Sequence, residues 1–589
     1  MYKLSKAQVG QKERFISRYI GATNAADGST VDANSNVTQK SLATLEAELY
    51  KEDTIQINRK IVWEKIKKLY GERLANKYLS DLSNHYIYSH DETSLRPYCA
   101  SITMYPFLLE GTKCLGGISG APKNLQSFCG SFVNMVYQVA SDFAGAVATV
   151  EFLHYFDYFA RKEYGSNYLE TNTKEVAQEL QGVVYALNQP ASARGNQSVF
   201  WNISVFDKNY MREMFGSFYY PDSTTVDFES TAKLQKFFME WFKEERKKEL
   251  LTFPVLTASV LTTSTGFADE EFVDFLCDQM SSGHSFFVYM SDSVDSLASC
   301  CRLRNELADN TFSYTLGAGG VVTGSAQVIT INLNRVVQSN VTLPTLHKRV
   351  QKYLLAHKAV YQDYISAGLL PSYSAGFMDI DKQFLTVGVN GLVEAAEYLG
   401  YTVGNNQDYI SWAAGVVGGL KKRNKEALKD TGVRFNTELV PAENLGVKNA
   451  KWDTEDNLMV PRKCYNSYFY VVEDEHSTLL DKIALHGKSI TQFLDGGSAL
   501  HCNLQQLMSA PQAKQLFNIC RLQGVPYFTF NVKCTICNHC GTIDPQTRTE
   551  CSACGSTDVD YGTRVIGYLK RVSNFSSERQ TEEERRFYM

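Results

Sequence analysis

The spacing of apolar side chains predicts helices in the first part of the chain. In residues 55–79, Val62, Ile66 and Tyr78 fall on one stripe at helical spacing, with lysine and arginine elsewhere. This pattern predicts an amphipathic helix. Residues 126–164 are rich in small apolar residues, which favours closely packed, buried helices with no evident site chemistry.

Strand-length apolar runs follow turn-rich segments further along. Residues 199–205, 327–335 and 384–388 each predict a strand, the last followed by a turn and a helix. Residues 231–251 contain the charged run KEERKKE, which predicts a helix with a solvated face. The pattern therefore mixes helices and strands, but it does not define how the strands are arranged.

Composition narrows the class of protein. With 589 residues, 44% of them hydrophobic, the chain can bury one very large core or several ordinary ones. The net charge of −5 argues against a general nucleic-acid-binding surface. Fourteen cysteines, many of them single within apolar runs, predict reduced thiols. We find neither a signal peptide nor a membrane-length apolar run, so we expect a soluble, cytoplasmic protein.

The cysteines near the end of the chain predict a metal site. The pairs Cys537/Cys540 and Cys551/Cys554 each place two thiolates on one tight turn, and four thiolates form a closed tetrahedral zinc site. A glycine follows each pair, which suits such turns. Cys534 offers an alternative partner for Cys537, which leaves the role of Cys540 open.

The hexapeptide RVIGYL at 564–569 predicts different chemistry. Glycine has no Cβ, so its α-carbon can become planar when a hydrogen atom is removed, and the flanking amides delocalise the electron. Gly567 lies just behind the cysteine pairs and close to the C-terminal residue Met589. The alternative is an ordinary turn glycine.

This combination resembles the glycyl-radical enzymes and, more narrowly, the anaerobic (class III) ribonucleotide reductases. The resemblance covers about residues 30–589. It implies that Gly567 stores the radical and that Cys301, directly before an arginine, is the thiyl-radical cysteine. Cys99, followed by a Leu-Leu-x-Gly turn, matches the cysteine that delivers reducing hydrogen. Glu443 matches a general acid/base near the ribose, although a carboxylate that favours a helix N-terminus is an equal reading.

The resemblance also implies substrate-binding residues, namely Ser101, Arg302 and Asn332. Two positions depart from the formate-using members, because this chain has Leu303 and Ser325 where serine and asparagine are usual. The reductant therefore stays open between formate and a dithiol protein of the thioredoxin or glutaredoxin type. The phosphorylation state of the substrate, the allosteric residues and the role of Cys300 also stay open.

The fold implied is a ten-stranded α/β barrel of two five-stranded parallel halves, with the radical cysteine on an internal finger loop. The implied organisation is a catalytic barrel at 1–530 without an N-terminal ATP-cone, a four-cysteine zinc module at 531–560, and the radical loop and tail at 561–589. The implied activity is anaerobic reduction of ribonucleotides, with triphosphates favoured, to DNA precursors. The implied partners are a radical-SAM activase, dNTP and ATP effectors, and a second copy of the chain.

Two alternatives are weighed. A pyruvate formate-lyase-like acyltransferase fits the adjacent Cys300 and Cys301, but not the four-cysteine module or Cys99. A non-enzymatic zinc ribbon that binds nucleic acid requires a basic face near the cysteines. The segment instead carries Asp544 and Asp558, which argues against that reading.

Overall fold

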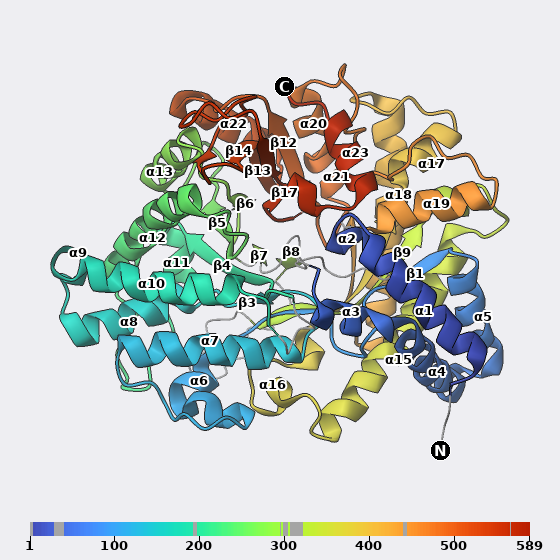
Figure 1. The fold of residues 1–589 in the computed structure, drawn as a ribbon, viewed down its shortest axis with the longest axis horizontal. Coiled ribbons are helices and arrows are strands. Elements are labelled where there is room, and N and C mark those ends of the chain that lie inside the picture. Colours follow the sequence, from blue (N-terminus) through green and yellow to red (C-terminus); the bar gives the residue numbers. More distant parts are fainter. Residues whose placement is uncertain are drawn as a thin grey trace.

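The structure is a computed structural model and describes most of the chain (Figure 1). The described residues are 4–28, 40–191, 197–294, 296–298, 304–306, 322–439, 444–565 and 567–589, the two short segments as backbone only.

Among the described residues, ten strands form a closed ring. The ring consists of two halves of five strands each. All five strands of the first half are parallel to their neighbours, and the second half contains a parallel group of three strands and a parallel pair. In ring order the strands of the first half are β2 (Cys99–Ser101), β3 (Val147–Ala148), β4 (Trp201–Phe206), β5 (Val255–Leu261) and β6 (Phe287–Ser291). Those of the second half are β13 (Tyr527–Val532), β12 (Leu500–Leu504), β11 (Phe435–Leu439), β10 (Phe384–Asn390) and β9 (Thr323–Asn332).

The two halves meet through antiparallel pairs, β2 with β9 and β6 with β13. The ring closes where Glu438 of β11 bridges Gly497, just before β12. A further strand, β1 (Ile87–Ser89), pairs antiparallel with residues 329–331, near the C-terminal end of β9. This architecture confirms the predicted α/β barrel. Between the halves, β7 (Ser296–Ala298) and β8 (Arg304–Glu306) pair antiparallel near the middle of the view in Figure 1.

Helices surround the ring (Figure 1). Among the longer ones are α7 (Leu125–Ser141), α8 (Phe152–Tyr164), α10 (Thr173–Asn188), α12 (Phe228–Lys248), α13 (Glu270–Ser281), α15 (Leu343–Ser366), α18 (Gln407–Thr431) and α22 (Ala510–Gln523). The buried helices predicted within 126–164 are α7 and α8, and the strand predicted at 199–205 is β4.

Three sequence predictions were wrong in part. The strand predicted at 327–335 is β9, which ends at Asn332, where helix α14 (Leu333–Val337) begins. The single helix predicted over 55–79 is two, α4 (Lys51–Tyr70) and α5 (Glu72–Ser83), because Gly71 has φ +89° and ends the first helix. The charged run on α12 is not wholly solvated, since Glu245 and Arg246 are buried. Arg246 is held because it donates to the carbonyls of Leu251 (3.1 Å) and Ser285 (2.7 Å).

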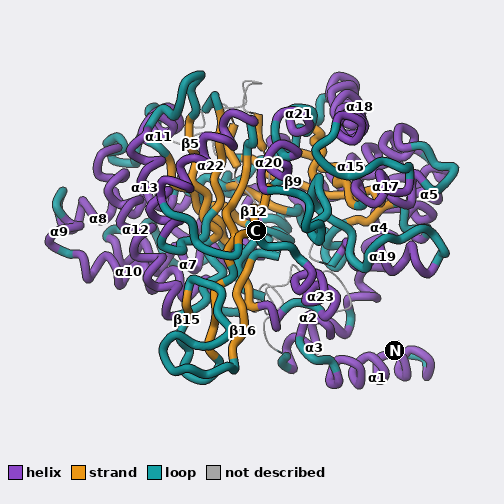
Figure 2. The backbone as a smooth tube through the Cα atoms, turned by 90° about the horizontal axis from the view of Figure 1, so that it is seen from above, coloured by secondary structure: helices purple, strands orange, loops and turns teal. Residues whose placement is uncertain are grey.

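A small separate sheet follows β13. Its order is β15 (Ile543–Asp544), β14 (Cys534–Cys537), β16 (Val559–Thr563) and β17 (Lys570–Arg571), and every pair is antiparallel. Figure 2 shows β15 and β16 extending away from the barrel. Helix α23 (Ser577–Arg585) comes next and lies beside the N-terminal helix α2 (Ala25–Gly28) in both views.

The two ends of the chain are joined there by hydrogen bonds. Asn24 donates to the carbonyl of Phe575 (2.8 Å), and the amide of Ser577 donates to Asp27 (2.9 Å). No helix within the described ranges is long and apolar enough to cross a membrane.

Candidate active site and metal centre

The inside of the barrel is lined by polar side chains. Side chains alternate between the two faces of a strand. The helix-facing positions are identified by their contacts, since Trp201 of β4 lies against Phe152 of α8 and Phe528 of β13 against Phe517 of α22. The neighbouring positions, Asn202 of β4 and Tyr527 of β13, therefore face inward.

Several of these inward groups have unused hydrogen-bonding capacity. Thr257 of β5 lies 3.4 Å from the hydroxyl of Tyr527, so Ser259, two residues on, faces inward as well. Within the described part of the chain, the Ser259 hydroxyl and the Asn202 amide nitrogen are buried without a partner. The amide nitrogen of Asn436 on β11 is likewise buried and has no hydrogen-bond partner among the described residues. Buried polar groups without partners are costly, so these groups favour a polar ligand inside the ring.

Cys99 lies on β2 and is 1% exposed. Its residue pairs with Ser325 of β9, and its carbonyl accepts a hydrogen bond from Gln383 (2.9 Å). Ser101 lies two residues further along and thus on the same face of β2. The Ser101 hydroxyl is fully buried and has no partner among the described residues. The structure therefore brings two of the predicted site residues together.

Gly567 lies in the loop of a β-hairpin, which we call the glycine hairpin: strands β16 and β17 with loop residues 564–569 between them. The stem closes where Thr563 pairs with Lys570. Gly567 is buried, and its carbonyl accepts a hydrogen bond from the Arg564 guanidinium (3.1 Å). Ile566 lies outside the described residues.

The glycine hairpin reaches the end of the barrel that carries Cys99. The ring of Tyr568 contacts Phe200 (5.3 Å between centroids) and Phe253 (6.0 Å), which directly precede β4 and β5. The register pairs Ala100 with Val147 and Val147 with Trp201, so Cys99 is level with Phe200. Two strand spacings separate them, which is about 10 Å. Gly567 and Cys99 thus belong to the same end of the barrel.

The side chain of Arg564 crosses to the start of β6. It donates to the Ser285 hydroxyl (2.9 Å) and the Ser285 carbonyl (3.2 Å). Arg246 donates to the same carbonyl (2.7 Å). Burial, and then repulsion from Arg564, lower the pKa of Arg246 well below its usual range. Two buried arginines, Arg246 and Arg564, therefore donate to one carbonyl at the base of the hairpin loop.

The four predicted metal ligands converge. The sulfurs of Cys537, Cys540, Cys551 and Cys554 all lie within 4.8 Å of one another. Cys537 and Cys554 are 3.6 Å apart, as are Cys540 and Cys551. A tetrahedral zinc ion with bonds of about 2.3 Å requires sulfurs about 3.8 Å apart, so the geometry and the donor set fit zinc.

The local backbone explains why the cysteines meet. Gly541 and Gly555, each directly after a cysteine pair, have φ of +77° and +70°. The Gly541 amide donates to the Cys537 carbonyl and the Gly555 amide donates to the Cys551 carbonyl, both at 3.0 Å, and these bonds close the two turns. Cys534 lies apart from the cluster, and its thiol donates to the Gly562 carbonyl (3.4 Å). Among the described residues, the glycine-flanked pairing is thus the one whose four sulfurs converge with a geometry that fits zinc.

Asn332 is not brought to Cys99. It ends β9, seven residues beyond Ser325, which corresponds to about 23 Å along a strand. Its side chain accepts from the amide of Arg335 (3.2 Å) and donates to Asp453 (2.9 Å). These contacts give Asn332 a place in a buried structural network, and its role in binding substrate stays a prediction.

Five predicted or discussed positions, Cys300, Cys301, Arg302, Leu303 and Glu443, lie outside the described residues. The inward groups Ser259 and Asn436 were not among the predicted site residues. The available signal was a polar residue at every second position of an apolar strand, as in WNISVF at 201–206.

Comparison with solved structures identifies the class. An anaerobic ribonucleotide reductase superposes with a TM-score of 0.85 at 26% identity, covering 99% of this chain and 93% of that one. The Thermotoga maritima enzyme with glycerol in the active site gives 0.83 at 28%, covering 98% and 94%. The same enzyme in complex with dATP and CTP gives 0.82 at 26%, covering 99% and 100%. The fold is therefore that of an anaerobic ribonucleotide reductase.

The family follows from the sequence. The family model of the anaerobic ribonucleoside-triphosphate reductases matches residues 46–588. No curated protein matched the chain. The chain belongs to the anaerobic ribonucleoside-triphosphate reductase family, and it is an oxidoreductase that reduces ribonucleotides. The family assignment argues against the acyltransferase and zinc-ribbon alternatives.

Proposed function

We propose that the reduction proceeds by glycyl and thiyl radicals, with Gly567 as the storage site. A separate radical-SAM activase removes one hydrogen atom from the Gly567 α-carbon. The glycyl radical takes the thiol hydrogen of Cys301, and the resulting thiyl takes the 3′ hydrogen of the ribose. Each step forms one bond to hydrogen and breaks one, so the radical moves while its number is conserved.

The reduction itself consumes two electrons and two protons and releases water. The 2′ hydroxyl leaves as water, with Glu443 as the acid/base group. Cys99 delivers hydrogen, and the reductant supplies the two electrons, formate becoming CO₂ or a dithiol protein becoming a disulfide. Cys301 then returns hydrogen to the 3′ carbon, and Gly567 returns hydrogen to Cys301.

One observation carries this proposal: the hairpin loop holds Gly567, buried, at the barrel end where Cys99 begins β2. The inward polar groups support a nucleotide substrate, taken as the triphosphate. Buried positioning supports radical chemistry because it excludes water and orients the reacting atoms.

The remaining assignments complete the proposal. Zinc bound by Cys537, Cys540, Cys551 and Cys554 would hold the stem of the glycine hairpin. Arg302 and Ser101 would contact the substrate. We further infer a homodimer from the family resemblance. We infer regulation by dNTP effectors because a solved relative carries dATP in its specificity site.

The test is electron paramagnetic resonance after anaerobic activation with a cognate activase, S-adenosylmethionine and a reductant. Wild type and Gly567→Ala are compared, with Gly182→Ala as the matched control because Gly182 is exposed and its added Cβ meets nothing within 4 Å. CTP is supplied with formate or with thioredoxin.

We expect a radical signal and deoxynucleotide from wild type and Gly182→Ala, and neither from Gly567→Ala. Cys99→Ser and Cys301→Ser should keep the signal and lose turnover, because they act after radical storage. Turnover by Gly567→Ala at the wild-type rate would contradict the proposal.

A further inference from the structure

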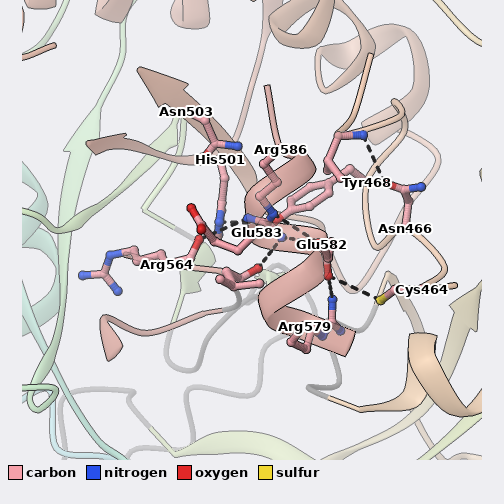
Figure 3. A network of polar contacts seen from close by, with 12 residues as sticks. Cys464, Asn466, Tyr468, His501, Asn503, Arg564, Arg579, Glu582, Glu583 and Arg586 are labelled. Atoms are coloured by element: carbon pink, nitrogen blue, oxygen red, sulfur yellow. Dashed lines mark hydrogen bonds and ion pairs between the residues drawn. The ribbon is translucent and has the colours of Figure 1, made fainter. Parts of the chain in front are cut away.

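The last helix buries charge instead of apolar surface. Helix α23 has the sequence SERQTEEER, yet Arg579, Glu582 and Glu583 on it are buried, as is Arg586 directly after it. Charged side chains are almost never fully buried unless they are paired. Figure 3 shows Glu582 between Arg579 and Arg586, with dashed lines from Glu582 to Arg579 and to the Cys464 thiol.

Three of these groups form a buried ion triad. Glu582 lies between Arg579 and Arg586, and its Oε1 accepts from Arg586 Nη2 (2.6 Å) and Nε (3.1 Å). Its Oε2 accepts from Arg579 and from the Cys464 thiol (3.3 Å). Although burial opposes ionisation, the two guanidinium groups lower the pKa of Glu582 to about 2.

The Arg586 guanidinium also binds the glycine hairpin. Its Nη2 donates to the Val565 carbonyl (2.7 Å) and its Nη1 to the Arg564 carbonyl (3.3 Å). The Arg564 side chain in turn donates to the Gly567 carbonyl. A chain of contacts thus runs from Glu582 through Arg586 to the loop residues around Gly567.

The residues after Arg586 fix its position from the other side. The amide of Phe587 donates to the Val472 carbonyl (3.0 Å), and Met589 exchanges two main-chain hydrogen bonds with Asn503 and Gln505 beside β12 (3.1 and 2.7 Å). The triad therefore holds the Arg586 side chain, and the main-chain hydrogen bonds to the barrel hold the residues that follow it.

We propose that Arg586 is a positioning residue that seats the glycine hairpin in the barrel, with Glu582 orienting its guanidinium. The inference rests on the proposed radical role of Gly567. Because Gly567 is buried, an activase reaches its α-carbon only when the hairpin loop leaves its seat. The Arg586 contacts oppose that departure and hold the loop in place during turnover. Loosening them favours radical formation and disfavours use of the radical.

The experiment compares Arg586→Gln and Arg586→Lys with Arg585→Gln. Arg585 is the adjacent arginine and is exposed, so it is a matched control for charge and helix position. Amide hydrogen exchange of the peptide covering 564–569 is measured on the full chain without activase. Spins per chain over time and deoxynucleotide formed per spin are measured after activation, and thermal unfolding reports on folding.

In Arg586→Gln we expect exchange in 564–569 to rise about tenfold, since charge-assisted hydrogen bonds to two carbonyls are lost. Radical formation should be as fast as in wild type or faster, while turnover per spin should fall by roughly 10²-fold, the effect of an error in position of about 1 Å. Arg586→Lys, which keeps the charge but not the paired donors, should lie between.

The idea is overturned if exchange and turnover per spin in Arg586→Gln equal those of Arg585→Gln. It is also overturned if radical formation and turnover fall together, which is the result of simple misfolding. If no radical forms in wild type, the proposed function fails, while the exchange measurement still decides whether Arg586 seats the loop.

Discussion

The glycine hairpin is attached at two places that differ in chemistry. Its stem pairs with β14, which carries Cys537 of the metal site, through pairs such as Cys537 with Val559. Its loop is held by Arg586, through hydrogen bonds to main-chain carbonyls. The first attachment lies beside a four-cysteine cluster whose thiols are partly exposed and whose geometry fits zinc, whereas the second is internal and buried.

The difference indicates that the two attachments have different structural roles. A structural metal site contributes folding free energy directly and is lost as a unit when one ligand is removed. A buried ion triad is weak evidence for added stability, but breaking it by removing one partner is expensive. We therefore expect the metal site to determine whether the stem exists and the triad to determine where the loop sits.

The largest effect is expected at the metal site. Cys551→Ser, or removal of zinc by a chelator, should unfold the small sheet and lower deoxynucleotide formation per spin by at least about 10²-fold, because the stem no longer aims the loop. Zinc content, spins and turnover are measured together, with Cys114→Ser as the control, because Cys114 is a free cysteine outside the cluster. Full turnover by zinc-free protein would refute the claim that the metal site determines whether the stem forms.

A smaller, pH-dependent effect is expected at the triad. The folded-state pKa of Glu582 is about 2, below its usual value of 4.5, so its stabilisation is present above about pH 4.5 and is lost as the pH falls toward 2. Glu582→Gln should therefore lower stability at pH 7 by about 3 kcal/mol. The difference in melting temperature from wild type should narrow steadily below pH 4.5.

The control for that series is Glu584→Gln, because Glu584 lies on the same helix and is exposed. Its melting temperature should equal that of wild type at every pH. A gap between wild type and Glu582→Gln that is constant from pH 7 to pH 3 would show that packing, and not the charge of Glu582, holds the triad.

The two attachments also differ in how far the sequence predicts them. The four cysteines and the two glycines that close their turns lie within one short segment, so local spacing was sufficient. The contact from Arg586 to Val565 was not predicted, because EEERR on a polar helix has the composition of a solvated surface. Arg246, buried within a lysine- and glutamate-rich run, was misread for the same reason.

The barrel followed from family resemblance and not from periodicity. Its strands are nearly continuous buried runs, so the polar positions that face inward cannot be separated from the rest without the register. Asn202 and Asn436 lie far apart in the chain, and only ring closure places both inside. Cys99 and Gly567 were predicted singly, while their common end of the barrel depends on the pairing of β2, β3 and β4.

The smallest effect is expected at Cys534, which tests which cysteines bind the metal. Its thiol lies apart from the cluster and donates one weak hydrogen bond to Gly562, and burial raises its pKa to about 11, unlike a metal-binding thiolate. Cys534→Ala should retain one zinc per chain and lose only about 1 kcal/mol of stability. Cys540→Ala should lose the zinc. The reverse outcome would move the site onto the Cys534/Cys537 pair, both on β14, and would bring the metal to the end of the stem nearest the loop, where Cys534 pairs with Gly562.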